Sequence, residues 1–376
     1  MTTAARRAAL RELLRTAGLD GLLVTDLVNV RYLTGFSGSN GAVLVAASGE
    51  ADTRFGTDGR YTARAAVEVP DLEPVVERAT VFALAQRAKD LGVHRLGFES
   101  DAVTVEAHAA LAAALDTTPT GPGSGAAASD TGTARVELVR APGLVAQLRV
   151  VKDAGEIALL RRACEIADAA LHAMIAEGGV RPGRTEREIA LDLEFRMRGL
   201  GADGPSFDSI VATGAHSAIP HHAPTDTAVS PGDLLKLDFG ALVEGYHSDM
   251  TRTLVVGRAA DWQRELYALV HAAQAAGCAA VGAGVPTKDV DAASRDVITA
   301  AGRGAEFVHG LGHGVGLVIH EAPALSAASR DVLEAGMVVT VEPGVYLPER
   351  GGVRIEDTLV VEGETLTGFP KELLEV

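Results

Sequence analysis

The segment His309–Leu317 carries glycine at every second position and reads His-Gly-Leu-Gly-His-Gly-Val-Gly-Leu. A His-x-x-x-His spacing on a helix is typical of a zinc-binding pair, but each glycine inside a helix costs about 1 kcal/mol relative to alanine. The glycines therefore predict an extended strand, with His309 and His313 on one face and bare backbone on the other. Bare backbone allows a neighbouring element or a substrate to approach closely. His320 follows three residues after the segment, and three histidines in so short a stretch favour a functional role.

Chain length and composition indicate a folded protein with two domains. The 376 residues exceed what one hydrophobic core ordinarily supports, and we expect domains at residues 1–145 and 146–376. Hydrophobic residues make up 47% and charged residues 22%, which is the balance of a folded, soluble protein. A net charge of -16 repels phosphate backbones, so nucleic acid is not expected as a partner.

The cysteines and the N-terminus predict where the protein resides. Cys164 and Cys278 are too few for a disulfide framework and lie in helix-like stretches among alanines, which fits a reducing compartment. Residues 1–12 contain arginines and no apolar run, unlike a signal peptide. No stretch approaches the roughly 18 uninterrupted apolar residues of a membrane span. We therefore predict a cytoplasmic protein without membrane contact.

Short apolar runs bounded by turn residues alternate with helix-like stretches up to residue 139, which predicts an α/β first domain. Residues 117–134 have the composition of a loop or linker, rich in Thr, Gly, Pro, Ala and Ser. The elements expected before it are a helix at 4–17, strands at 22–25 and 42–45, a glycine- and serine-rich loop at 29–39, and a turn at 57–61 leading into a helix.

The second half of the chain begins with a helical pattern and continues with strand pairs. Apolar residues at helical spacing and alternating apolar residues distinguish the two. We expect helices at 152–176, 262–280 and 288–301, a strand pair at 233–239 and 247–256 around a turn at 243–246, and a second strand pair at 338–342 and 352–360.

Asp238 and Asp249 flank the turn of the first strand pair and are eleven residues apart. On a hairpin they fall on the same face, opposite or diagonal to each other, with Cβ atoms roughly 4.5–8 Å apart. Both could point to solvent. However, neighbours such as Leu237 and Phe239 indicate buried strands, and a buried, unpaired carboxylate is costly. We therefore expect a positive group between the two aspartates.

Glu342 and Glu356 each end or interrupt a β-branched run, where a single glutamate would ordinarily be a solvent charge on an edge strand. With the two aspartates and His313 they make four carboxylates and one neutral imidazole, a formal charge of about −4. Two divalent cations neutralise this charge, whereas one leaves it strongly anionic. Oxygen ligands with one nitrogen and no thiolate favour manganese, cobalt, iron, zinc or magnesium. Two such cations can share a bridging hydroxide and clamp a carbonyl oxygen.

In this order, Asp, Asp, His, Glu, Glu, the five residues resemble the ligand set of the pita-bread metallopeptidases, which include methionine aminopeptidase, aminopeptidase P and prolidase. The resemblance covers roughly residues 150–376. It implies two bound divalent ions, manganese first, with cobalt, zinc or iron as alternatives, held by Asp238, Asp249, His313, Glu342 and Glu356. The motifs that carry it are Leu237-Asp238-Phe239-Gly240, Ser248-Asp249-Met250-Thr251-Arg252-Thr253, the segment 309–316, Val341-Glu342-Pro343-Gly344-Val345-Tyr346 and Val353-Arg354-Ile355-Glu356-Asp357.

Residues 29–41 and 57–61 resemble the creatinase-type N-terminal domain that aminopeptidase P and prolidase carry and methionine aminopeptidases usually lack. The expected fold class is therefore α+β, with a creatinase-like α/β domain followed by a pita-bread catalytic domain. In those families the first domain takes part in oligomer contacts and helps to wall the active site, which implies a homodimer or homotetramer. Creatinase shares the fold without the metal ligands, so a metal-free enzyme of that kind is disfavoured.

The segment 220–225 resembles the one that carries a catalytic histidine in this family. Its alignment assigns that role to His221 and leaves the role of His222 open. The same resemblance adds four expected residues: His320 as a second histidine facing the substrate, His309 near the metal ligands and Tyr346 in the pocket as substrate-binding residues, and Arg354 in a hydrogen-bond link to the metal ligands.

The predicted reaction is hydrolysis of the peptide bond between an N-terminal residue and a following proline by a hydroxide held between two metal ions. His221 and His320 would donate hydrogen bonds to the tetrahedral intermediate, and Glu342 would move a proton toward the leaving nitrogen. The loop and turn of the first domain favour an Xaa-Pro aminopeptidase, whose substrates are peptides with proline in the second position. An Xaa-Pro dipeptidase (prolidase) is the alternative, and a non-catalytic pita-bread binding module is a third interpretation.

Overall fold

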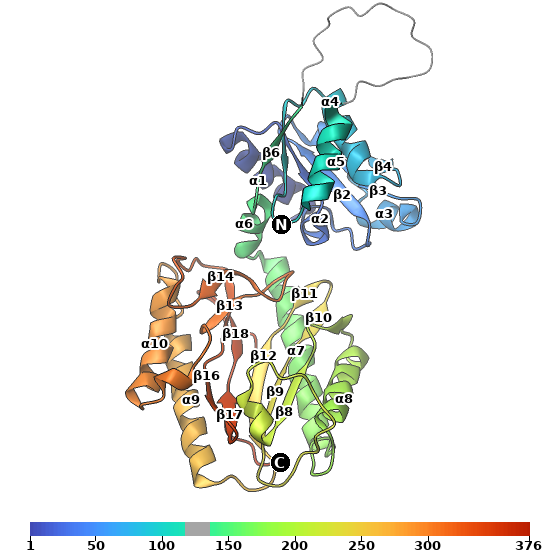
Figure 1. Ribbon diagram of the computed structural model, residues 1–376. Helices are drawn as coiled ribbons and strands as arrows, with labels where there is room; N and C mark the ends of the chain where they lie inside the picture. Colours follow the sequence, from blue (N-terminus) through green and yellow to red (C-terminus); the bar gives the residue numbers. More distant parts are fainter. Residues whose placement is uncertain (117–135) are drawn as a thin grey trace, which may run out of the picture. The chain divides into compact units, whose positions relative to one another are not determined.

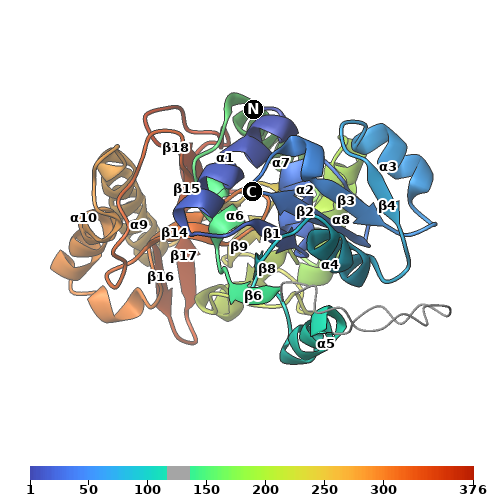
Figure 2. The same ribbon diagram turned by 90° about the horizontal axis from the view of Figure 1, so that it is seen from above.

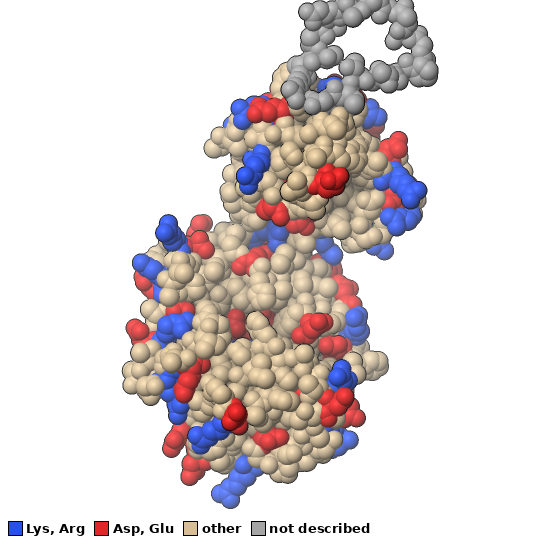
Figure 3. All heavy atoms as spheres, viewed as in Figure 1, with Lys and Arg blue, Asp and Glu red and all other residues tan. Residues whose placement is uncertain are grey.

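The computed structural model describes residues 1–116 and 136–376, which fall into two units, Met1–Arg149 and Val150–Val376 (Figure 1). The linker predicted at 117–134 lies outside the described residues. Among the described helices, none is long and apolar enough to cross a membrane. On the face shown in Figure 3, acidic and basic side chains are interspersed over both units.

The first unit contains a mixed sheet with the strand order β4-β3-β2-β1-β5-β6, flanked by helices. β1 runs antiparallel to β2 and parallel to β5, which confirms the α/β class expected for this half. Its strands are β1 (Gly21–Val24), β2 (Gly41–Ala46), β3 (Arg54–Thr57), β4 (Pro74–Val76), β5 (Arg95–Phe98) and β6 (Glu137–Arg140). Its helices are α1 (Thr3–Thr16), α2 (Leu27–Thr34), α3 (Thr62–Glu68), α4 (Thr80–Asp90), α5 (Val105–Asp116) and α6 (Leu144–Val150), with a short 3-10 turn at Glu50–Asp52.

The stretch predicted as a loop at 29–39 is helical in its first half. Asp26 caps helix α2 by accepting a hydrogen bond from the amide of Val28 at 2.9 Å. The helix buries Val30 and Leu33, and Gly35 ends it with a φ of 83°. The prediction was wrong here because the glycines and serines that follow Gly35 were given more weight than the cap and apolar spacing before it.

The second unit places its strands between two pairs of helices (Figures 1 and 2). Helices α7 and α8 cover the three-stranded sheet β12-β9-β8, and α9 and α10 cover the four-stranded sheet β14-β13-β15-β18. The helices are α7 (Ala154–Ala176), α8 (Glu186–Gly199), α9 (Asp261–Ala280) and α10 (Thr287–Ala300), with 3-10 turns at Gly214–Ala218 and Gly304–Glu306. The strands are β7 (Gly204–Pro205), β8 (Ile210–Thr213), β9 (Leu234–Phe239), β10 (Ala241–Val243), β11 (Tyr246–His247), β12 (Met250–Val255), β13 (Gly312–Gly314), β14 (Glu321–Leu325), β15 (Val338–Val341), β16 (Gly344–Leu347), β17 (Gly351–Arg354) and β18 (Asp357–Val360).

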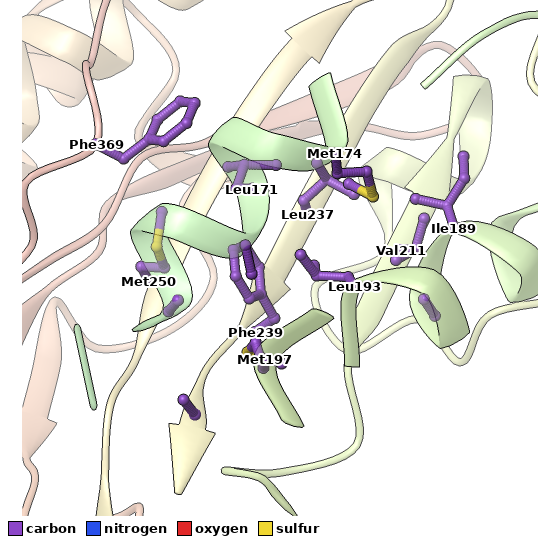
Figure 4. Close-up of a cluster of buried hydrophobic side chains, with 14 of the residues drawn as sticks. Leu171, Met174, Ile189, Leu193, Met197, Val211, Leu237, Phe239, Met250 and Phe369 are labelled. Atoms are coloured by element: carbon purple, nitrogen blue, oxygen red, sulfur yellow. The ribbon is translucent and has the colours of Figure 1, made fainter. Parts of the chain in front are cut away.

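A hydrophobic core fixes α7 and α8 against the first of these sheets. Figure 4 shows Leu171 of α7, Leu193 of α8 and Phe239 of β9 among its side chains, and all three are fully buried. Helix α8 begins in a capping box, in which Thr185 and Glu188 each accept a hydrogen bond from the other's backbone amide. The start of α8 is therefore held at a defined place beside β8.

The strands that approach the expected metal ligands are shorter than predicted. The strand expected over 309–317 is limited to β13. The strand expected at 352–360 divides into β17 and β18 at Ile355 and Glu356, and the single pair expected there is two pairs, β15 with β18 and β16 with β17. Likewise, Ser248 and Asp249 separate β11 from β12. These breaks place carboxylates at strand ends, where their side chains turn toward the interior.

Candidate metal centre

A cavity of about 180 Å³ lies within the second unit, and the five predicted metal ligands meet in its lining. The predicted catalytic histidines His221 and His320 line the same cavity, and three apolar side chains complete the lining. The residues are Phe207, Ile210, His221, Asp238, Asp249, His313, Ile319, His320, Glu342 and Glu356.

The two aspartates are brought together by the pairing of β9 with β12. Asp238 lies opposite Thr251, and Asp249 precedes Thr251 by two residues, so the two aspartates are diagonal neighbours on one face. A side chain on Gly240 would overlap the carbonyl of Ser248. Glycine at this position therefore permits the close backbone approach that precedes Asp249.

His313 presents one ring nitrogen to the carboxylates because its other nitrogen is engaged. Nδ1 lies 3.1 Å from the carbonyl oxygen of Gly314, to which it donates. Nε2 lies 3.3 Å from Oε1 of Glu342 and 3.5 Å from Oδ2 of Asp249. A backbone hydrogen bond that fixes the tautomer in this way is usual for histidines that bind metals. Side chains on Gly312 or Gly314 would overlap the backbone of β15 or of the start of β14, so the bare face is packed against backbone, as expected.

Two of the buried carboxylates are only half satisfied by hydrogen bonds. Oε2 of Glu356 accepts from the hydroxyl of Thr251 at 2.7 Å, and Oδ2 of Asp238 accepts from Arg354. Their other oxygens, Oε1 of Glu356 and Oδ1 of Asp238, are buried without a hydrogen-bond partner among the described residues. A buried acceptor left unpaired costs about 1–3 kcal/mol. A bound cation would remove this cost.

The electrostatics of the carboxylates also indicate missing positive charge. Burial, followed by the charges of Glu356 and Asp238, raises the pKa of Asp249 well above its ordinary value. Burial and the charges of Glu342 and Asp238 do the same for the pKa of Glu356. Burial opposes the ionisation of Glu342 too, but its hydrogen bond with His313 holds its pKa at about 2. Four carboxylates compete for too few donors, and the residues fit two divalent cations.

Arg354 lies behind the carboxylates and pairs with two of them, Asp238 and Glu342. Its guanidinium contacts Asp238, and its Nε donates to the hydroxyl of Thr251 at 3.0 Å. One terminal nitrogen donates to the hydroxyl of Tyr346 at 2.9 Å, which also lies 2.8 Å from Nε2 of His309. His309 and Tyr346 thus bond to each other behind the ligands and are not among the residues that line the cavity. Their contact with substrate stays a prediction.

His221 and His320 are exposed residues of the cavity lining, whereas the five ligands are buried or half-buried. The ring of His320 meets that of His313 edge-on, with centroids 4.3 Å apart. Burial and the neighbouring His313 lower the pKa of His320, which favours a neutral ring that can donate one hydrogen bond. The predicted catalytic histidines therefore flank the carboxylates on the side open to solvent.

Lys236 is a fully buried residue near the cavity that the sequence analysis missed. Its Nζ donates to the carbonyl oxygens of Ile219 at 2.6 Å and Pro220 at 3.1 Å, just before His221. Burial and the neighbouring Arg354 lower the pKa of Lys236 to about 6. Its position two residues before Asp238, on the same face of an otherwise apolar strand, is the sequence pattern that could have indicated it.

Comparison with known proteins places this arrangement in a family. The sequence matches Metallopeptidase family M24 over residues 158–363, more than half of the chain, and the Creatinase/Prolidase N-terminal domain over residues 6–151. The chain belongs to metallopeptidase family M24. The first match confirms the hydrolase class and the pita-bread domain, and the second confirms the creatinase-type first domain that was predicted from the motifs.

Several peptidases resemble this chain along nearly its whole length. The uncharacterized peptidase YqhT of Bacillus subtilis is 42% identical over 97% of this chain and 98% of its own. The solved structure of an Xaa-Pro dipeptidase from Bacillus anthracis is 40% identical, with a TM-score of 0.91 and full coverage of both chains. That of an X-Pro aminopeptidase from Thermotoga maritima is 33% identical, with a TM-score of 0.85, and the match covers 96% of this chain and 99% of that one.

Proposed function

We propose that this M24 peptidase is an Xaa-Pro dipeptidase that cleaves the bond before proline with two divalent ions. The observation that carries the proposal is the group of buried carboxylates with unpaired oxygens around one cavity. The ions would be held by Asp238, Asp249, His313, Glu342 and Glu356. When bound, they supply Lewis-acid activation of a water molecule and of the scissile carbonyl.

The residues of the chain have distinct tasks in this proposal. His221 and His320 donate hydrogen bonds to the carbonyl oxygen as it gains negative charge. Glu342 accepts the proton of the attacking water and passes it to the leaving nitrogen of proline. Arg354 holds Asp238 through its guanidinium and Thr251 through its Nε, so that the carboxylates keep their orientation.

The lining of the cavity supports a proline in the substrate. Phe207, Ile210 and Ile319 provide an apolar wall that suits a pyrrolidine ring. The Xaa-Pro dipeptidase from Bacillus anthracis, similar over its full length, supports the choice of proline and of dipeptides.

An Xaa-Pro aminopeptidase, the first choice from the sequence, is the second candidate, and one feature favours it. A recess of about 450 Å³ shares Ile210 and His221 with the cavity and continues past Leu191, Asp208 and Pro224. It offers room for residues that follow proline in a longer peptide. Manganese as the native metal, a homodimer or homotetramer, and a cytoplasmic location also stay predictions.

The test is hydrolysis of Ala-Pro and Ala-Pro-Ala by enzyme loaded with manganese, cobalt or zinc, with Ala-Ala as the control that lacks proline. The proposal expects metal-dependent cleavage of Ala-Pro and little cleavage of Ala-Ala. Cleavage of the tripeptide as well would establish the aminopeptidase, and cleavage of the dipeptide alone would exclude it. Purified protein that holds no metal and cleaves none of these peptides with any metal would favour a binding module.

A further inference from the structure

One buried carboxylate of this domain, that of Glu186, lies outside the metal centre and has no part in the mechanism above. Glu186 is the first residue of α8 and is fully buried. Its carboxylate accepts five hydrogen bonds, all from residues 213–225. The donors are the amide of Thr213, ring nitrogens of His216 and His222, and the amide and hydroxyl of Thr225.

These hydrogen bonds close residues 213–225 into a loop. Oε1 of Glu186 accepts from the amide of Thr213 at 2.9 Å, and Oε2 accepts from the amide of Thr225 at 2.9 Å. One carboxylate therefore holds both ends of the segment. His221 lies between these ends, and Nε2 of its neighbour His222 donates to Oε2 of Glu186 at 2.8 Å.

The same loop is held from the side of the metal centre. Lys236 donates to the carbonyls of Ile219 and Pro220, and Arg354 donates to that of Pro220 at 3.2 Å. The backbone just before His221 is thus held by hydrogen bonds from Lys236 and Arg354, and the residue just after it is held by Glu186. These bonds fix the backbone on both sides of His221, from which its ring projects.

Glu186, His216 and His222 also have the composition of a metal site, since their ligand atoms lie within 4.8 Å of one another. However, both oxygens of Glu186 already accept several hydrogen bonds. Burial opposes its ionisation, but the hydrogen bonds from Thr225, Thr213 and His222 lower its pKa to about 2. A carboxylate so well supplied with donors needs no cation.

We propose that Glu186 is a positioning residue that acts through His222 and the loop 213–225 to hold His221 against the reacting carbonyl. This inference rests on the proposed function, in which His221 contacts that carbonyl. It also gives His222, which sequence comparison left unassigned, a role in orienting its neighbour. A displacement of about 1 Å of a group that acts on the transition state can cost about 100-fold in rate, so a loosened loop should lower kcat.

The experiment is a double-mutant cycle with Glu186→Gln and His221→Ala, measured on Ala-Pro with manganese-loaded enzyme. Glutamine keeps the shape of the side chain but turns an amide NH₂ group toward the donors. We expect E186Q to lower kcat about 10- to 100-fold with KM and the bound metal unchanged. In the H221A background the same change should have almost no further effect, because the residue through which it acts is gone. The proposal would be overturned if the fold-losses in kcat of the two single variants multiplied in the double variant, or if E186Q had the kcat of the wild type.

Glu188→Gln is the matched control, since it removes a negative charge from the same helical turn without touching the loop. Its kcat should equal that of the wild type. If E186Q does not fold, His222→Ala removes a single donor and should give a smaller fall in kcat that also disappears in the H221A background. An H222A loss that persists there would overturn the proposal.

Amide hydrogen exchange tests the loop without any substrate. We expect E186Q to accelerate exchange at Thr213 and Thr225 and to leave the helices unchanged, and unchanged exchange in the loop would overturn the proposal. This result is independent of peptide cleavage, so wild-type enzyme that cleaves no Xaa-Pro peptide would refute the proposed function alone. If the wild type bound a third equivalent of zinc and E186Q did not, Glu186 would belong to a metal site, and the proposal that it is a positioning residue would be overturned.

Discussion

The second unit contains two groups of carboxylates and histidines that could each hold a metal, and they differ in how well their carboxylates are satisfied. In the group Asp249, His313 and Glu356, Oε1 of Glu356 is buried without a hydrogen-bond partner among the described residues, and burial together with neighbouring carboxylates raises the pKa of Asp249 and Glu356. In the group around Glu186, five hydrogen bonds surround one carboxylate.

The difference shows that residue type and proximity do not by themselves identify a metal centre. Glu186 with two histidines has the composition of a zinc site, but its charge is already balanced by donors. The carboxylates at the cavity have too few donors for all of their oxygens, and a cation or a proton would stabilise the unpaired ones in a buried place. Unpaired oxygens and raised pKa values of carboxylates therefore distinguish a cation site from a structural cluster.

The largest expected effect is loss of catalysis when a cavity carboxylate is neutralised. Asp249→Asn removes one ligand charge, and we expect kcat on Ala-Pro to fall about 10²- to 10³-fold, comparable with loss of an electrostatic group that acts on the transition state. Bound manganese, measured by mass spectrometry after gel filtration, should fall below two per chain. His216→Ala, the control in the other group, should retain two. Two bound ions in the Asp249 variant, or loss of an ion in the His216 variant, would reverse the assignment of the two groups.

A smaller effect, opposite in sign between the groups, is expected on the stability of metal-free protein. Glu186→Gln leaves buried donors unpaired and should cost about 1–3 kcal/mol of unfolding free energy. Asp249→Asn relieves repulsion among carboxylates and should stabilise the metal-free protein by about 1 kcal/mol. Thermal unfolding in excess chelator measures both. Added manganese should stabilise the wild type by about 2.7 kcal/mol at 100 times the Kd of a site and stabilise the Asp249 variant less. An Asp249→Asn variant that is less stable than the wild type in excess chelator would contradict the comparison.

The two groups also differ in how far the sequence could predict them. Asp238 and Asp249 were placed on one face because side chains on strands alternate with a period of two, and their pairing depends only on a hairpin. Glu186 and His222 are 36 residues apart, and no local pattern joins them. Their contact follows from packing of α8 beside β8, which lies beyond short-range periodicity.

The strand breaks show a similar limit. Glu342 and Glu356 were recognised as interruptions of β-branched runs, but the sequence did not show that β15 pairs with β18 while β16 pairs with β17. Pairing of distant strands is decided by the whole sheet rather than by local propensity. Residue identities and motif order thus predicted the five carboxylate and histidine ligands and the two further histidines that line the cavity, but not its apolar wall, and the fold was needed to show which carboxylate oxygens are unpaired.

The smallest expected effect is a pH dependence confined to the Glu186 group. The pKa of Glu186 is lowered in the folded protein from 4.5 to about 2, so ionised Glu186 stabilises the fold fully above pH 4.5, and this contribution is lost as the pH falls toward 2. A protonated carboxyl has the same charge as the glutamine of Glu186→Gln. The difference in unfolding midpoint between wild type and this variant should therefore be largest above pH 4.5 and shrink toward pH 2. Other carboxyl groups titrate equally in both proteins and cancel in the difference. A difference that stays constant, or grows, as the solution is acidified would show that the ionised carboxylate is not what holds the loop.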